Sequence, residues 1–167
     1  ASSTLMLKST VSNTTDNVTV VCDGVSTRGL VFRDLAIIPQ NAANGRHGLV
    51  FDTQAEGSFI ANFLVDNCSL QGTSNGLAIA NLVDATPTVP MMFDSTVRGC
   101  LIGGGIKLVD VADSMWWQNN LFYGANAGME ISCVSGAAKW VIRDSTFVNT
   151  GGGIWMKSPS PRLSRCR

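Results

Sequence analysis

The feature that most limits the fold of this sequence is an internal repeat in which two short apolar patterns alternate. The first pattern has an apolar residue, a polar residue, a turn former, a small or apolar residue, and then another apolar position. Its copies are Phe32–Ile37, Val65–Leu70, Val97–Ile102, Trp117–Phe122 and Ile142–Phe147. The second pattern begins with glycine, and its copies are Gly48–Phe51, Gly76–Ile79, Gly105–Leu108, Gly128–Ile131 and Gly153–Met156. These glycines lie 28, 29, 23 and 25 residues apart, which sets the length of one repeat unit.

This repeat predicts stacked strands. No segment shows a sustained apolar period of 3.6 residues with helix caps, whereas Val-, Ile-, Leu- and Phe-rich segments alternate with Gly, Asn, Asp and Ser clusters. Repeat lengths of roughly 20–50 residues are typical of solenoids. The expected fold is therefore all-β, a right-handed parallel β-helix of about five to six coils. An antiparallel sandwich or jelly roll is the alternative.

The chain is expected to form one domain whose two ends differ from its middle. Residues 30–157 hold the repeats, and residues 1–29 are expected to be an irregular N-terminal segment or a first coil. Residues 158–167 contain two prolines and show no alternation, so we expect a tail outside the solenoid. Such ragged ends indicate a piece of a larger protein, or ends that are buried in an oligomer.

Side chains alternate along a strand, so equivalent positions of successive repeats should form columns. Two apolar columns are expected to point inward. The first contains Phe32, Val65, Val97, Trp117 and Ile142, and the second contains Ile37, Leu70, Ile102, Phe122 and Phe147. Residue types that accept left-handed backbone angles form the corner between them, at Asp34, Asn67, Gly99, Asn119 and Asp144. An outward column, interpreted mainly as a surface ion ladder, contains Arg33, Asp66, Arg98, Gln118 and Arg143.

The composition limits the classes of binding partner and the cellular compartment of folding that we expect. Lys plus Arg and Asp plus Glu number 12 each, so no overall charge attracts nucleic acid or an anionic membrane. No apolar run approaches the roughly 20 residues of a membrane-spanning helix. The five cysteines contain no Cys-x-x-Cys pair, and Cys68 and Cys100 share one inward column, so we expect reduced buried thiols and folding in a reducing cytoplasm. No cofactor and no metal are expected.

A strand with an Asp or Asn corner, followed by a strand that begins with glycine, resembles the coils of pectate-lyase-like β-helices, and most closely those of bacteriophage tailspikes. The resemblance covers Gly29 to Lys157 and matches no catalytic motif, because the only histidine, His47, lacks a preceding glycine. It implies a homotrimer in a virion tail or outside the cell, folded in the host cytoplasm. The implied ligand is a bacterial capsule or lipopolysaccharide glycan, which such proteins often cleave as hydrolases or lyases.

The outward column of the second pattern is the first candidate site. It is expected to contain Val50, Ala78, Lys107, Glu130 and Trp155. An indole can stack on a sugar ring, and Glu130 can act as a catalytic acid if a second carboxylate lies roughly 5–9 Å away. Lys107 and Trp155 are thus candidate binding residues, and Asp110 is the candidate second acid, with Asp113 and Asp52 as further possibilities. The alternative is a solvated salt pair beside an aromatic residue packed on a neighbouring subunit.

Two further groups are candidates for contacting a glycan. Trp116 and Tyr123 form a second possible sugar platform, with packing under a loop or at a trimer seam as the alternative. Arg143 belongs to the Arg-rich column, which could bind an acidic glycan. The leading hypothesis is therefore a tailspike segment that binds a surface polysaccharide and, in the complete protein, cleaves it. The alternative is a structural stalk or adhesin spacer, and a secreted monomeric lyase ranks third.

Overall fold

The computed structural model of the chain describes residues 3–7, 18–21, 26–39, 47–53, 58–72, 76–83, 92–108, 114–124, 128–132, 140–148, 153–157 and 162–164. These residues form 21 strands and no helix. The described part of the chain accordingly offers no helix that is long and apolar enough to cross a membrane.

All strand pairs in the described residues are parallel, and they form three long sheets and one short one. The first sheet contains β1 (Ser3–Leu7), β5 (Leu35–Pro39), β9 (Ser69–Gln71), β13 (Leu101–Gly103), β16 (Leu121–Tyr123) and β19 (Thr146–Val148). The second contains β2 (Val18–Val21), β6 (Leu49–Thr53), β10 (Ile79–Val83), β14 (Ile106–Leu108), β17 (Gly128–Ser132) and β20 (Gly153–Lys157). The third contains β4 (Val31–Arg33), β8 (Leu64–Asp66), β12 (Ser95–Arg98), β15 (Met115–Gln118), β18 (Trp140–Arg143) and β21 (Arg162–Ser164). The short sheet contains β3 (Ser26–Arg28), β7 (Phe59–Ala61) and β11 (Met92–Phe93).

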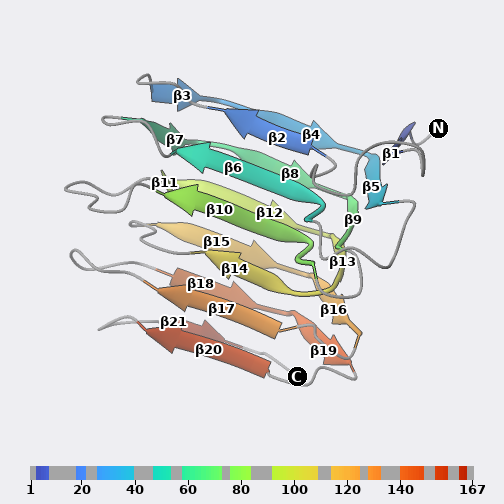
Figure 1. Cartoon of the computed structure of the whole chain (residues 1–167). Coiled ribbons are helices and arrows are strands. Elements are labelled where there is room, and N and C mark those ends of the chain that lie inside the picture. The colour runs from blue at the N-terminus through green and yellow to red at the C-terminus, as the bar shows by residue number, and fades with distance from the viewer. Residues whose placement is uncertain are drawn as a thin grey trace.

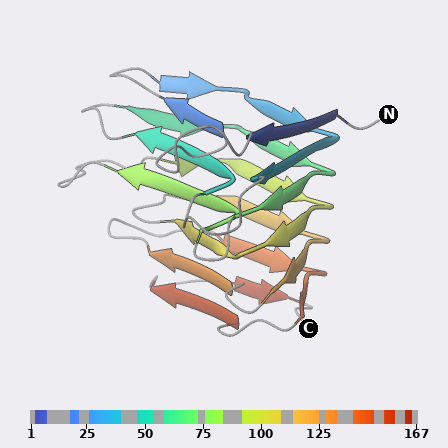
Figure 2. The same cartoon turned by 45° about the vertical axis from the view of Figure 1, so that its right-hand side comes forward.

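The chain visits these sheets in a fixed cycle. From β4 onward it passes from the third sheet to the first and then to the second before it returns to the third, with the short sheet inserted in the earlier repeats. Each strand therefore pairs with its equivalent one repeat later, and the colours in Figures 1 and 2 run in order from one end of the stack to the other. The fold is all-β with stacked parallel sheets, an arrangement that fits a solenoid.

The two inward columns of the first pattern are confirmed. Val65 pairs with Val97, Val97 with Trp117, and Trp117 with Ile142, and all four side chains are fully buried. In the other column Phe122 stacks on Phe147, with ring centroids 4.4 Å apart and planes 4° from parallel. The indole N–H of Trp117 has no hydrogen-bond partner among the described residues, so this large side chain stabilises the stack by packing.

The corner column is confirmed by its backbone angles. Asp34, Asn67, Asn119 and Asp144 have φ values of 56°, 52°, 54° and 51°, and Gly99 has 63°. Asn and Asp tolerate this left-handed conformation better than other residues with a Cβ, which explains the composition of the column. At the first corner the Asn67 amide also donates to Asp34 Oδ1, over 2.7 Å.

The inward positions just after the corners at Asn67, Gly99, Asn119 and Asp144 carry a buried ladder of thiol and polar side chains. Cys68, Cys100, Asn120 and Ser145 are each exposed by 2 % or less. The Asn120 amide donates to Val97 O and accepts from Cys100 N, both over 3.0 Å, and Asn120 N donates to Ser145 Oγ over 3.3 Å. These side chains thus satisfy the backbone of the preceding repeat, at the place where the corner interrupts the regular sheet bonds.

Cys68 and Cys100 are free thiols, as expected, and they interact with each other. A hydrogen bond from the Cys100 thiol lowers the pKa of Cys68 to about 7, and the same bond together with burial raises the pKa of Cys100. The Cys68 thiol is also 3.3 Å from Asp66 O, and the Cys100 thiol 3.1 Å from Arg98 O. Both sulfur atoms are enclosed in the stack, which favours a structural role over a reactive one.

The predicted register of the second pattern is wrong in one repeat. Ile79 pairs with Leu49 and Ile106, so Ala78 takes the place expected for Gly76, and Ala80 the outward place expected for Ala78. The shift is two residues, which leaves every inward side chain inward, so the alternating sequence could not exclude it. Both Val50 and Ala80, although outward in register, are buried, with 0 % and 4 % exposed.

The ends of the chain take part in the sheets. In residues 1–29, strands β1, β2 and β3 pair with β5, β6 and β7, which favours a first repeat over an irregular segment. Within residues 158–167, strand β21 pairs with β18, contrary to the expectation of a tail outside the stack. Both prolines of this segment, Pro159 and Pro161, precede β21 in the sequence, so neither removes a hydrogen bond from it.

Candidate functional site

The candidate site is a hollow on the outer face of the second sheet, floored by glycine. Gly128 and Gly153 pair with each other, two residues before Glu130 and Trp155 on the same face of β17 and β20. Because neither carries a side chain, the sheet is recessed beside the larger residues, and the open hollow has a volume of about 190 Å³. A Cβ at Gly153, which has φ +53°, would meet no atom within 4 Å. The repeated glycine thus creates space at this place.

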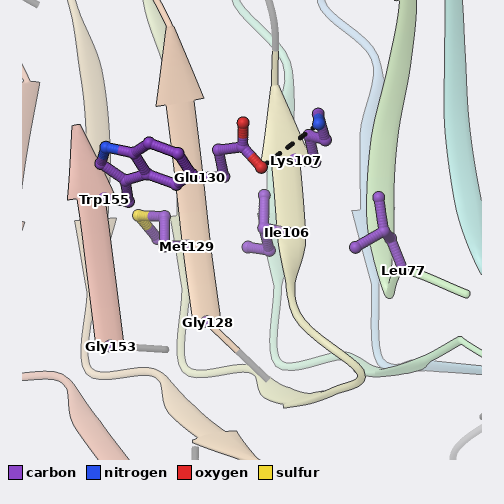
Figure 3. A pocket seen from close by; sticks show the side chains of 8 residues that line it. All are labelled: Leu77, Ile106, Lys107, Gly128, Met129, Glu130, Gly153 and Trp155. Atoms are coloured by element: carbon purple, nitrogen blue, oxygen red, sulfur yellow. Dashed lines mark ion pairs between the residues drawn. The ribbon is translucent and has the colours of Figure 1, made fainter. Parts of the chain in front are cut away.

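Three outward side chains form a row along the hollow, as the sequence predicts. Lys107 pairs with Glu130, and Glu130 with Trp155, so β14, β17 and β20 supply one residue each. Lys107 Nζ lies 3.2 Å from Glu130 Oε2, and the two side chains are 47 % and 30 % exposed. Trp155 is 58 % exposed, and its indole lies beside the carboxylate in Figure 3. A cation, an anion and an aromatic face therefore lie in line, accessible to solvent.

The rest of the hollow is apolar and anchored in the core. Ile106 and Met129, each about 1 % exposed, belong to the buried core, and Leu77 lines the hollow beyond Lys107 (Figure 3). The backbone N–H of Leu77 donates to His47 Nδ1 over 3.0 Å, which ties this wall to the preceding repeat. His47, which matched no catalytic motif, thus helps to hold the wall of the hollow.

The row can hold a ligand more readily than it can cleave one. Glu130 is the only carboxylate among the described residues that line the hollow. Hydrolysis of a glycosidic bond ordinarily requires a second acid within roughly 5–9.5 Å. Asp110, the expected second acid, and Asp113 lie outside the described residues, and Asp52 lies on β6, two strands away from β14 in the second sheet. The geometry therefore provides binding groups and one acid.

The remaining candidate residues lie on other sheets. Trp116, half-buried on β15, and Arg143 on β18 face outward from the third sheet, and Tyr123 lies on β16 in the first. Trp116 and Tyr123 therefore lie on two different sheets, on either side of the Asn119 corner. The Tyr123 ring instead covers Gly103, where a Cβ would come within 2.7 Å of the ring. Neither ring joins the hollow of the second sheet.

The expected ion ladder is present on the third sheet. Asp66 accepts two hydrogen bonds from Arg98, over 3.0 and 2.9 Å, and one from Arg33 over 3.1 Å. The Arg98 hydrogen bonds, with smaller contributions from Arg33, hold the pKa of Asp66 below its usual value of 3.8. Arg143 donates to the Gln118 amide over 3.1 Å. The column is thus an interstrand network that carries more positive than negative charge.

Sequence reasoning missed the glycine floor and the Leu77 wall. The signal for the floor was present, because Gly128 and Gly153 precede Glu130 and Trp155 by two residues, and alternation places i and i+2 on the same face. The repeat pattern uses these glycines only as the first residue of each copy. Leu77 could not be found in this way, because its place depends on the register shift of its repeat.

Comparisons of the chain with protein-family models, curated proteins and solved structures give no match. Within the described residues, no group of three or more His, Cys, Asp or Glu could hold a metal ion. The functional argument therefore depends on the geometry of the hollow.

Proposed function

We propose that this chain is a bacteriophage tailspike segment that binds a bacterial capsule or lipopolysaccharide glycan in the hollow of the second sheet. The observation that carries the proposal is the exposed Trp155 indole, in line with the Lys107–Glu130 ion pair above a glycine floor. An indole offers a flat apolar surface to a sugar ring, and the ion pair offers both a donor and an acceptor to its hydroxyls.

The proposal also describes the fold more specifically than as stacked parallel sheets. The cyclic strand order supports a closed β-helix of about five to six coils, with six strands in each long sheet. Right-handedness follows from the strong preference of parallel strand connections for that hand. By its resemblance to tailspikes, the protein assembles as a homotrimer, folds in the host cytoplasm and works in the virion tail or outside the cell. A solution mass of three times 17.7 kDa would support the trimer.

Cleavage of the glycan belongs to the complete protein in this proposal. Glu130 is the candidate acid, but its carboxylate is paired with Lys107, and a hydrolase also needs a partner acid and a lyase a base. Asp110 is the candidate partner for Glu130. The segment itself binds, and depolymerase activity as a glycoside hydrolase or lyase depends on groups that complete the site.

The test is binding of the purified chain to a panel of capsular and lipopolysaccharide glycans, with Trp155→Ala as the main variant. Trp116→Ala is the matched control, because it removes an outward-facing indole from the third sheet. Loss of binding in Trp155→Ala alone supports the site, and loss in Trp116→Ala alone would move it to the third sheet. In the complete protein Glu130→Gln separates the roles, since loss of cleavage with retained binding would identify Glu130 as the acid.

A structural stalk is the second candidate function. It is favoured by the continuous parallel pairing within the three long sheets and by the Arg33–Asp66–Arg98 network, which joins three consecutive strands of the third sheet. A chain that binds no member of the glycan panel and yet remains folded would favour the stalk over the tailspike segment.

A further inference from the structure

We infer that the hollow selects an uncharged sugar, although the outer face of the third sheet carries arginines that could bind acidic glycans. This inference rests on the proposed glycan-binding function and specifies its ligand. It follows from the charges of the row, the size of the hollow and the separation of the arginines from it.

The charges of the row disfavour an anionic ligand. Lys107 is the only cation and Glu130 the only anion among the described residues of the hollow, and their charged atoms are 3.2 Å apart. A uronate or sialate carboxylate near this pair would be attracted by the ammonium and repelled by the carboxylate over similar distances, so the two Coulomb energies nearly cancel. The acid would still lose part of its hydration on binding. The described residues of the hollow supply no second cation to compensate for that loss.

The same pair suits neighbouring hydroxyl groups. A hydroxyl can accept a hydrogen bond from the Lys107 ammonium while the next hydroxyl donates to Glu130. Both bonds have a charged partner, and such bonds are stronger than neutral ones. The ion pair therefore keeps its charge balance while it binds a vicinal diol of an uncharged sugar.

The indole and the hollow limit the ligand further. Trp155 lies one strand beyond Glu130, about 4.8 Å along the stack, where it can cover the apolar face of the ring that carries the diol. The volume of about 190 Å³ is smaller than the roughly 300–1,000 Å³ of sites for drug-sized ligands. One ring therefore occupies the hollow, and the rest of the polysaccharide extends beyond it.

Acidic glycans have a different place to bind. Arg33, Arg98 and Arg143 project from the third sheet, and Asp66 is the one acid in their column. An acidic sugar that binds this chain should therefore contact the arginines and be insensitive to changes in the hollow. The two surfaces lie on different sheets, so their ligands can be distinguished by mutation.

The variant that tests the hollow is Gly153→Asn. Asn accepts the φ of +53° at this position, and its side chain would extend into the open space above the floor. Gly29→Asn is the matched control, because Gly29 also has a positive φ of +71° and open space at its Cβ, but does not line the hollow. Melting temperatures of both variants close to that of the unaltered chain would show that Gly153→Asn preserves the fold.

The experiment measures binding of uncharged and uronic-acid oligosaccharides of equal length by calorimetry. We expect uncharged ligands to bind, with Kd raised at least roughly tenfold by Gly153→Asn and roughly 2- to 10-fold by Trp155→Ala, and unchanged by Gly29→Asn. Glu130→Gln should shift the preference toward acidic ligands, because it leaves Lys107 with an unbalanced positive charge.

The outcomes distinguish the inference from the proposed function. If acidic sugars bind in a Trp155-dependent manner and uncharged ones do not, the inference is overturned and the glycan site stands. Binding of uncharged sugars that Gly153→Asn leaves unchanged would also overturn it, since the hollow would not be the site. If neither class binds the folded chain, both the inference and the proposed function fail.

Discussion

Replacement of Asn120 by alanine should be among the most destabilising single changes in this protein that do not remove a large apolar side chain. The change removes the acceptor of Cys100 N and leaves that amide buried without its partner, which costs about 1–3 kcal/mol. It also removes the bond to Val97 O, worth about 0.5–1.5 kcal/mol. We expect a loss of about 1.5–4.5 kcal/mol, which in a chain of this length lowers Tm by roughly 3–18 °C.

Urea unfolding followed by circular dichroism measures this loss, with the unfolding midpoint compared at a common slope. Gln118→Ala is the control, because Gln118 is an amide of the same repeat whose hydrogen bond to Arg143 is exposed to solvent. That variant should lose less than about 0.5 kcal/mol. A loss below about 1 kcal/mol in Asn120→Ala, or one equal to the control, would refute the role assigned to the buried ladder.

Three further predictions concern the corner and the networks beside it. Asn119→Val should lower the free energy of unfolding by about 1–2 kcal/mol and Asn119→Gly by much less, because φ is 54° at this position. Equal unfolding midpoints of the two variants would contradict the left-handed conformation assigned to this corner. Asp66 has a lowered pKa, so its ion pairs stabilise the fold above about pH 4 and lose this effect as the pH falls through the folded-state pKa. Asp66→Asn should remove that part of the dependence of stability on acid pH. The same dependence in the variant and in the unaltered chain would contradict the prediction. Cys68 should react with iodoacetamide only on unfolding despite its pKa of about 7, because the side chain is 2 % exposed; rapid labelling of the folded chain would show that the corner opens.

The columns of the first pattern could be predicted because two independent signals coincide there. The apolar positions alternate, and an Asp, Asn or Gly marks the corner between them, so a slip of even one residue would misplace a left-handed residue such as Asn67. The second pattern has only its alternation and a leading glycine. In Gly76–Val83 that alternation continues through Ala80, so two registers fit equally well, and only contacts between repeats select one.

The site was predicted in part for the same reason. Lys107, Glu130 and Trp155 fall in one row because their repeats share the glycine register, which the structure retains between β14 and β20. The platform of Trp116 and Tyr123 stays a prediction, because the two residues lie on different sheets and closeness in sequence does not by itself place side chains on one face across a corner. The wall at Leu77 depends on a pairing between distant segments, which no local pattern contains.

The row across β14, β17 and β20 takes one side chain from each repeat, and this gives the surface a modular character. A substitution at one of these positions changes a single point of the row while the buried columns keep their register. Insertion or deletion of a whole repeat would move that point by about 4.8 Å without altering the backbone on either side. The outer surface can thus change one repeat at a time while the scaffold keeps its packing.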